Sequence, residues 1–267
     1  MPAVWRAAPL ALAALVAAGC ATTTTRAPFP TAPNPGTVFH GFSRPEGAGP
    51  FPAVVLLHTC GGVSGHMTRW AAQLKGAGYA SVIVDSFTPR GRAACSIPHY
   101  YPATLDQVTE DAFAALEYLQ GRPDIHADRI AVLGFSYGAS AVLRTSSARY
   151  RRGAPGGGFR AGASYYPLCV SPRPEWPAAA QERANNLFDD IDAPTLVLMG
   201  ADDVDTPGVA QNCANKVTEL ARRGRPIAIN MYPGAAHVFD VHNPAAAQKA
   251  FEDLKAFLAR HLKSGGS

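Results

Sequence analysis

Ile130-Ala131-Val132-Leu133-Gly134-Phe135-Ser136-Tyr137-Gly138 is the stretch of sequence that decides the fold. Its apolar first half is typical of a buried strand, and 139–151 after it has the pattern of a helix. A sharp turn between the two holds Ser136 in a strained backbone, so its neighbours two residues away must be small for strand and helix to pack closely. Gly134 and Gly138 meet that requirement. The stretch therefore predicts a turn that exposes Ser136 as a nucleophile.

On either side of this stretch, short apolar runs alternate with longer segments of helical periodicity. Such alternation predicts a parallel sheet covered by helices. Two segments, 105–119 and 251–262, carry apolar residues on one helical face, and Asn243 and Pro244 supply the second helix with an N-cap and a first-turn proline. The expected strands are continuous apolar runs at 53–57, 81–85, 130–135, 162–166, 195–199 and 227–232.

A serine hydroxyl is a weak nucleophile at neutral pH, so Ser136 needs a histidine base and an acid that orients the base. In this strand-turn-helix context both should follow, in the order Ser, Asp, His. We expect His237 to be the base, because it comes between the last strand and the last helix; His242 is a weaker alternative. The acid should follow the fifth expected strand. Three carboxylates are available there: Asp202, Asp203 and Asp205.

Acyl transfer also needs N–H donors for the negative charge that develops on the carbonyl oxygen. One donor is normally the amide after the nucleophile, and the other comes from the loop after an early strand. The loop His58-Thr59-Cys60-Gly61-Gly62 follows the first expected strand, and its glycines allow amides to turn inward. We therefore expect the backbone N–H groups of Cys60 and Tyr137 to form an oxyanion hole. A plain glycine-rich turn is the alternative.

Composition fits one globular domain that does not bind nucleic acid. The chain has 267 residues, of which 47% are hydrophobic, enough to bury one sizeable core. The net charge of +4 is spread over a chain with only 16% charged residues, so nucleic acid is not an expected partner. The sequence contains no Cys-x-x-Cys and no His-Glu-x-x-His pattern, so no metal site is expected.

The first nineteen residues are typical of an export signal. Arg6 precedes an apolar stretch of roughly 12 residues, which suits a signal peptide better than a membrane-spanning helix. Ala17-Ala18-Gly19-Cys20 resembles the lipobox of bacterial lipoproteins, and Ala21 resembles the next residue of outer-membrane lipoproteins. We expect a signal peptide over 1–19 and a lipid anchor on Cys20 in the cell envelope. The alternative is a periplasmic or secreted protein with a free Cys20 thiol.

The rest of the chain divides into a tether, a folded domain and a tail. Residues 20–36 are rich in Thr and Pro and predict an extended tether, followed by the domain at 37–263 and a tail at 264–267. The domain contains four cysteines, and an even number in an exported chain favours disulfides over metal ligands. Of three possible pairings we expect two bonds that would each follow neighbouring strands at one sheet edge: Cys60 with Cys95 and Cys169 with Cys213.

Several motifs together resemble the dienelactone hydrolase family of the α/β-hydrolase fold. They are the 58–62 loop, Asp85-Ser86-Phe87, 111–119 before 128–130, the turn at Ser136, 200–207 and 232–239. The resemblance implies a mostly parallel sheet of about eight strands with helices on both faces, and ester hydrolysis without a cofactor. The spacing in relatives from Gly200 to Pro207 implies that Asp203 is the acid, which leaves Asp202 and Asp205 as solvated loop charges.

Two departures change the substrate that the resemblance implies. The namesake enzymes have a Cys at the turn and a Glu in the early loop, where this chain has Ser136 and Thr59. They also bind a substrate carboxylate with an Arg shortly after the catalytic His, and 239–242 contains none. Cleavage of dienelactone itself is therefore not expected. Arg90 and Arg92 are candidates for binding an anionic substrate group, although such arginines more often pair with Asp85 or water.

The sequence thus predicts an exported serine hydrolase that cleaves a small carboxylic ester through an acyl-enzyme. The short connection at 170–190 leaves no room for a large lid, which favours a soluble short-acyl ester. A peptidase or an acyltransferase could use the same three residues, because the pocket walls choose the leaving group and the acceptor. A catalytically idle lipoprotein that binds a ligand is a third alternative. Membrane contact is expected only through the lipid anchor, and no oligomeric state is predicted.

Overall fold

The computed structural model describes Met1 and residues 38–96, 101–169, 188–204 and 208–263. Apart from Met1, the predicted signal peptide, the anchor at Cys20, the tether and the tail lie outside the described residues, as does most of the 170–190 connection. In the part of the chain that is described, no helix is both long enough and apolar enough to cross a bilayer.

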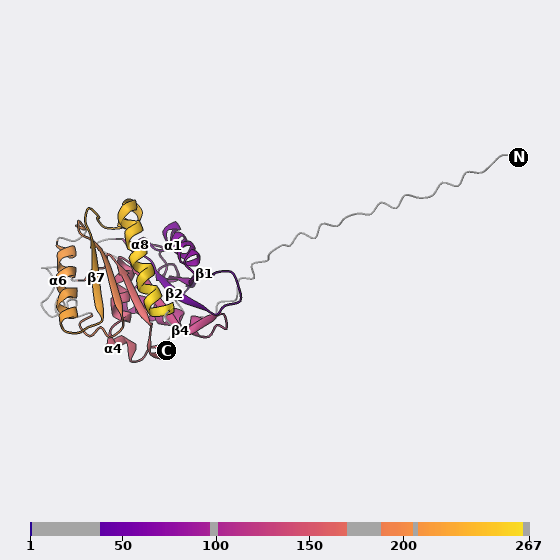
Figure 1. The fold of residues 1–267 in the computed structure, drawn as a ribbon, viewed down its shortest axis with the longest axis horizontal. Helices are drawn as coiled ribbons and strands as arrows, with labels where there is room; N and C mark the ends of the chain where they lie inside the picture. The colour runs from indigo at the N-terminus through magenta and orange to yellow at the C-terminus, as the bar shows by residue number, and fades with distance from the viewer. Residues whose placement is uncertain (2–37, 97–100, 170–187, 205–207, 264–267) are drawn as a thin grey trace.

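A seven-stranded sheet forms the centre of the molecule, in the order β1-β3-β2-β4-β5-β6-β7 (Figure 1). All neighbouring strands are parallel except β1, which runs antiparallel to β3 at the edge. The strands are β1 Val38–Ser43, β2 Phe51–Leu57, β3 Ala80–Asp85, β4 Ile125–Phe135, β5 Ala161–Tyr165, β6 Thr195–Gly200 and β7 Ile227–Tyr232. The predicted α/β architecture is confirmed, with one strand fewer among the described residues than the family resemblance implied.

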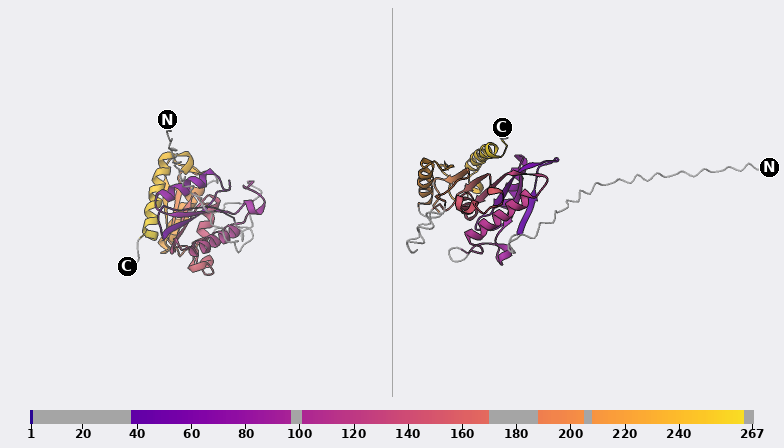
Figure 2. Two further views of the ribbon diagram at one scale, coloured as in Figure 1. Left: turned by 90° about the vertical axis from the view of Figure 1, so that its right-hand side faces the viewer. Right: turned by 90° about the horizontal axis from the view of Figure 1, so that it is seen from below.

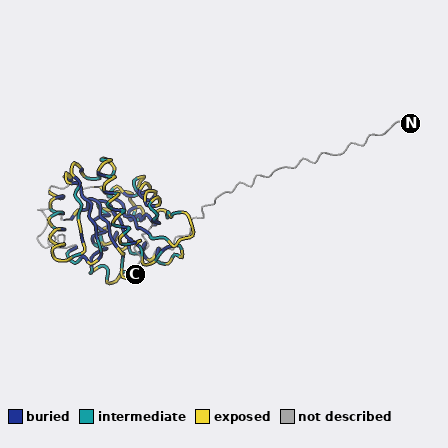
Figure 3. The backbone as a smooth tube through the Cα atoms, in the orientation of Figure 1, coloured by how far each residue is buried: buried dark blue, intermediate teal, exposed yellow. Residues whose placement is uncertain are grey.

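Helices cover both faces of this sheet (Figure 2). They are α1 Gly65–Gly76, α2 Leu105–Gln120, α3 Tyr137–Thr145, α4 Ala148–Arg151, α6 Val209–Arg222, α7 Phe239–His242 and α8 Pro244–Leu258. Alternate side chains of β2 enter opposite core clusters: Val54 packs in the cluster that includes α1 and α8, and Val55 in the one that includes α2. Burial is therefore greatest along the central strands, and the exposed residues lie on the outer helices and loops (Figure 3).

The C-terminal helix begins where its capping signals lie. Asn243 Oδ1 accepts a hydrogen bond from the Ala246 N–H at 3.1 Å, and Pro244 occupies the first turn. The predicted helix at 139–151, by contrast, is divided into α3 and α4. Ser146 and Ser147 separate the two helices, because their backbone pairs with 190–193, as in the bond from Asp192 N–H to Ser146 O at 3.1 Å.

Candidate active site

Ser136 lies in the turn between β4 and α3, with φ 51° and ψ −109°. This is a conformation that side chains other than glycine rarely adopt. A Cβ atom on Gly134 would lie 2.4 Å from the carbonyl oxygen of Gly138, and one on Gly138 would lie 2.6 Å from the carbonyl oxygens of Leu57 and His58. The two glycines therefore allow α3, β4 and the end of β2 to meet, and this contact holds the turn in its strained form.

Three side chains that are far apart in sequence meet at the carboxyl ends of the strands. His237 Nε2 lies 3.1 Å from Ser136 Oγ, and His237 Nδ1 lies 2.7 Å from Asp203 Oδ2. The Asp203 side chain is fully buried, whereas that of His237 is 23% exposed. A carboxylate can only accept, so Nδ1 carries the proton and Nε2 is left to accept the Ser136 hydroxyl hydrogen.

The loop after β6 explains why Asp203 reaches the imidazole. A Cβ atom on Gly200 would lie 2.3 Å from the carbonyl oxygen of Ala235, so the loops after β6 and β7 are in direct contact. The Asp202 N–H donates to that same carbonyl at 2.9 Å, and the Asp202 side chain is exposed. Asp205 lies outside the described residues, and His242 is exposed on α7.

The loop 58–62 lies directly against the Ser136 turn, because the Gly138 N–H donates to the His58 carbonyl at 3.1 Å. The Tyr137 N–H opens α3, where no helical carbonyl precedes it. Both predicted oxyanion donors therefore belong to segments that meet beside Ser136.

His58 connects this loop to the loop after β3, a role that the sequence did not reveal. Its Nε2 accepts from the Ser86 N–H at 3.2 Å, so its Nδ1 carries the proton and donates to the Thr59 carbonyl at 2.7 Å. Burial lowers the pKa of His58, which outweighs the opposing effects of Thr59, Asp85 and Asp111. The ring is therefore neutral at neutral pH and fixed in one tautomer.

Disulfides join Cys60 to Cys95 and Cys169 to Cys213, the pairs expected from sequence. The first bond attaches the 58–62 loop to the chain after β3. The same segments share a hydrogen bond from the Cys95 N–H to the Cys60 carbonyl at 2.8 Å. The second bond attaches the chain after β5 to α6.

The structure does not support the predicted substrate contact of Arg90. Its guanidinium donates to both carboxylate oxygens of Asp111, at 2.7 and 3.1 Å, and to the Ser86 carbonyl at 2.7 Å. Asp111 is fully buried on α2, and releasing Arg90 would leave that charge without its bidentate partner. Arg90 therefore has a structural role. Arg92 is exposed, and its substrate contact stays a prediction.

Tyr166, directly after β5, also borders the site and was not singled out from the sequence. Its ring meets the His237 imidazole edge to face, with centroids 4.9 Å apart, and its φ is 43°. Its hydroxyl donates to Asp240 Oδ1 at 2.7 Å. Neither residue lies in a motif of its own.

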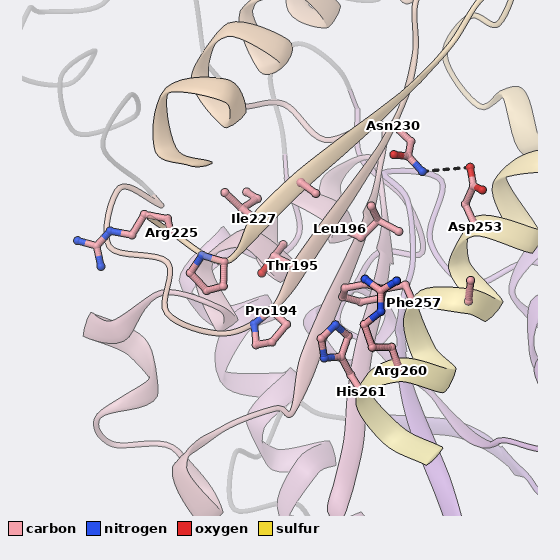
Figure 4. A pocket seen from close by; sticks show the side chains of 13 residues that line it. Pro194, Thr195, Leu196, Arg225, Ile227, Asn230, Asp253, Phe257, Arg260 and His261 are labelled. Carbon is pink, nitrogen blue, oxygen red and sulfur yellow. Dashed lines mark hydrogen bonds between the residues drawn. The ribbon is translucent and has the colours of Figure 1, made fainter. Parts of the chain in front are cut away.

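Two cavities lie outside this constellation. One of about 520 Å³ is at the amino-terminal ends of β6 and β7, beside α8 (Figure 4), so it is at the far end of the sheet from Ser136. The other, of about 290 Å³, is bordered by α1 and α8 and by Asp240. Within the described ranges, no three His, Cys, Asp or Glu side chains are grouped to hold a metal ion.

Comparison with known proteins identifies the family of this chain. The model of the dienelactone hydrolase family matches residues 40–262, which is most of the chain. The chain belongs to the dienelactone hydrolase family. The chain is accordingly a carboxylic ester hydrolase.

Two relatives and a solved structure are also similar to this chain. The chain is 24% identical over 234 residues to a "Probable 2-oxo-3-(5-oxofuran-2-ylidene)propanoate lactonase" from Bradyrhizobium sp., covering 82% of this chain and 88% of the relative. It is 22% identical over 251 residues to a "Putative carboxymethylenebutenolidase" from Synechocystis sp., covering 87% and 96%. The propionate-bound esterase Est2 from Thermogutta terrifontis has the same fold, with a TM-score of 0.62 at 18% identity, over 84% of this chain and 90% of the esterase.

Proposed function

We propose that the protein hydrolyses a small carboxylic ester or lactone through an acyl-enzyme formed on Ser136. The observation that carries this proposal is the hydrogen-bond chain from the Ser136 hydroxyl through His237 to Asp203, with distances of 3.1 and 2.7 Å. It joins a nucleophile, a base and an orienting acid in the order that acyl transfer requires.

In the proposed reaction, His237 Nε2 takes the hydroxyl proton while Ser136 Oγ forms a bond to the carbonyl carbon. The negative charge moves to the carbonyl oxygen, where the amides of Cys60 and Tyr137 donate hydrogen bonds to it. Collapse of this intermediate breaks the bond to the alkoxy oxygen, and the imidazolium gives its proton to that oxygen. Water then attacks the acyl-enzyme by the same steps and releases the acid. Asp203 stabilises the imidazolium and keeps its own charge throughout.

The same steps apply to a lactone, whose alkoxy oxygen stays attached to the acid that is released. The printed names of two relatives, a lactonase and a carboxymethylenebutenolidase, support a lactone as one substrate class. Family membership favours hydrolysis of an ester over two alternatives: cleavage of an amide by a peptidase, and transfer of the acyl group to an acceptor other than water by an acyltransferase. Pocket walls rather than the triad would distinguish these reactions.

We also infer that the protein is exported and acts in the cell envelope. Disulfides persist in oxidising compartments, and both cysteine pairs of the described domain are joined. Together with the signal-peptide pattern and the lipobox-like Cys20, this favours an envelope lipoprotein over a cytoplasmic enzyme.

A fluorophosphonate probe followed by peptide mapping tests the proposed function. The expected result is a single adduct on Ser136, no adduct in Ser136→Ala, and hydrolysis of p-nitrophenyl acetate and a small γ-lactone that the probe abolishes. Labelling of another residue, or hydrolysis that persists after complete labelling of Ser136, would overturn the proposal. A p-nitroanilide amide in the same assay tests the peptidase alternative.

A further inference from the structure

Besides the proposed acid Asp203, another buried carboxylate lies near His237 in the sequence, three residues after it. The proposed ester mechanism does not use this carboxylate. Asp240 is on the short helix α7, and its side chain is only 2% exposed. A carboxylate withdrawn from water is costly unless several donors replace its hydration. A buried charge beside the proposed base therefore needs an explanation.

Asp240 receives three donors from two distant parts of the chain. His66 Nε2 and Trp70 Nε1, both on α1, lie 2.6 and 2.9 Å from Asp240 Oδ2, and the Tyr166 hydroxyl lies 2.7 Å from Oδ1. Since His66 Nε2 faces a carboxylate, it carries a proton. The Trp70 N–H, which is also 3.1 Å from that nitrogen, therefore donates to Asp240.

These donors keep Asp240 charged despite its burial. Burial by itself raises the pKa of this carboxyl, but hydrogen bonds from His66, Tyr166 and Trp70 and the charge interaction with His66 outweigh it. The pKa of Asp240 therefore lies below its usual value.

The network reaches the imidazole through Tyr166. The buried tyrosine ring meets the His237 ring edge to face at 4.9 Å, with an interplanar angle of 63°. The Tyr166 N–H donates to the Leu198 carbonyl at 2.8 Å, which attaches the backbone at the end of β5 to the neighbouring strand β6. The bond to Asp240 fixes the other end of the side chain, so the ring is held at both ends.

We propose that Asp240 is a positioning residue for His237. It holds Tyr166 as a wall against one side of the imidazole, and it anchors α7, which begins two residues after His237, to α1. The imidazole thereby keeps Nε2 toward Ser136 and Nδ1 toward Asp203. The hydrogen bonds of Asp240 go to His66, Trp70 and Tyr166, none of which takes part in the proposed reaction steps. The inference rests on the proposed function of Ser136 and His237.

The chain contains a matched pair that serves as a control. Tyr232 on β7 donates its hydroxyl to Asp253 on α8 at 2.9 Å, and Asn230 donates to the same carboxylate oxygen at 3.0 Å. Asn230 and Asp253 line the cavity at the far end of the sheet (Figure 4). This pair likewise joins a tyrosine hydroxyl to a carboxylate, although the Asp253 side chain is 19% exposed and also pairs with Lys249. The Tyr232 ring packs against Phe239 at 5.1 Å, whereas the Tyr166 ring packs against His237.

The test compares Asp240→Asn and Tyr166→Phe with Asp253→Asn and Tyr232→Phe. We expect the first two variants to lower kcat by about 10- to 100-fold with KM within about 2-fold, because a displaced base slows the chemical step. The rate at which a fluorophosphonate labels Ser136 should fall by a similar factor. The control variants should keep kcat and the labelling rate within about 2-fold of wild type, even where their Tm falls as much as that of Asp240→Asn or Tyr166→Phe.

Tyr166→Phe retains the ring but removes the hydroxyl through which Asp240 holds it, so it provides the test if Asp240→Asn does not fold. Unchanged kcat and labelling in folded Tyr166→Phe and Asp240→Asn would overturn the proposal. An equal loss of kcat in the control pair would also overturn it, because the effect would then follow stability. A failure of the proposed function is distinguished from these outcomes, since wild type itself would then carry no adduct on Ser136.

Discussion

Ser136 has a strained backbone, and its hydroxyl lies within hydrogen-bond distance of the His237 imidazole. At the scale of a residue, removal of this hydroxyl is the most direct test of the proposed nucleophile. We expect Ser136→Ala to lower kcat by about three to six orders of magnitude, because the acyl-enzyme cannot form. The Tm should stay within a few degrees of wild type, since the glycines on either side keep the turn in place. Hydrolysis of p-nitrophenyl acetate and thermal unfolding followed by circular dichroism measure both. Turnover near the wild-type rate would contradict the proposed nucleophile.

Protonation of His58 predicts how stability depends on pH. Its pKa is lowered from 6.5 in the folded state, so between that lowered value and 6.5 the unfolded chain binds more protons. The stability associated with neutral His58 is therefore present above pH 6.5 and is lost as the pH falls. Asp240, whose pKa is lowered from 3.8, has the same sign but acts in a more acidic window. We expect Tm to fall between pH 7 and pH 5, with a smaller fall in His58→Gln. An equal slope in the two proteins would contradict this.

At the scale of helices and strands, regular patterns could be predicted and irregular ones could not. All six expected strands are present, because buried parallel strands are continuous apolar runs. The edge strand β1 was missed, since His40, Gly41 and Ser43 interrupt its apolar residues and its pairing is irregular between Phe39 and Phe42. Helix α1 was also missed, although its buried residues at 67, 70, 71 and 74 have helical spacing.

In the candidate site too, some residues could be predicted from the sequence and others could not. Ser136, His237 and the loop that carries the acid could be predicted because their order along the strands determines which loops meet at one edge of the sheet. The choice of Asp203 over Asp202 and Asp205 came only from the spacing that the family resemblance implies. The partners of Asp240 could not be predicted, because they lie 174, 170 and 74 residues away in the sequence. Contacts of this kind depend on how the loops pack, and no local pattern in the sequence encodes them.

The Cys60–Cys95 disulfide predicts a difference between two loops of similar size. The two disulfides span 35 and 44 residues, so the loss of either should cost about 4 kcal/mol on chain-entropy grounds. Only the first holds the segment that carries the proposed Cys60 amide. We therefore expect Cys95→Ser to lower kcat by about 10-fold more than Cys213→Ser, because a shifted oxyanion donor weakens transition-state binding. Equal kcat values at matched loss of Tm would show that the disulfide does not position this amide.

At the scale of the whole molecule, the disulfides and the N-terminal sequence favour the same compartment. One disulfide lies in the chain after β3 and the other joins the chain after β5 to α6. Because the cytoplasm keeps thiols reduced, neither bond would persist there. A domain that depends on them for stability would be favoured outside the cytoplasm. The proposed signal peptide supplies that route, and the Thr- and Pro-rich stretch at 20–36 would separate the domain from a lipid bilayer.

This proposal predicts where the chain is found when its own N-terminus is kept. Expressed in a Gram-negative host, wild type should fractionate with the membranes, and its mature mass should correspond to a chain that begins at a lipidated Cys20. Cys20→Ala removes the thiol that would carry the diacylglycerol, so this variant should leave the lipidated membrane pool. Its kcat after purification should equal that of wild type, because Cys20 precedes the folded domain. An unmodified mature N-terminus in wild type would contradict the anchor, because the lipid on Cys20 is what distinguishes an anchored chain from a secreted one.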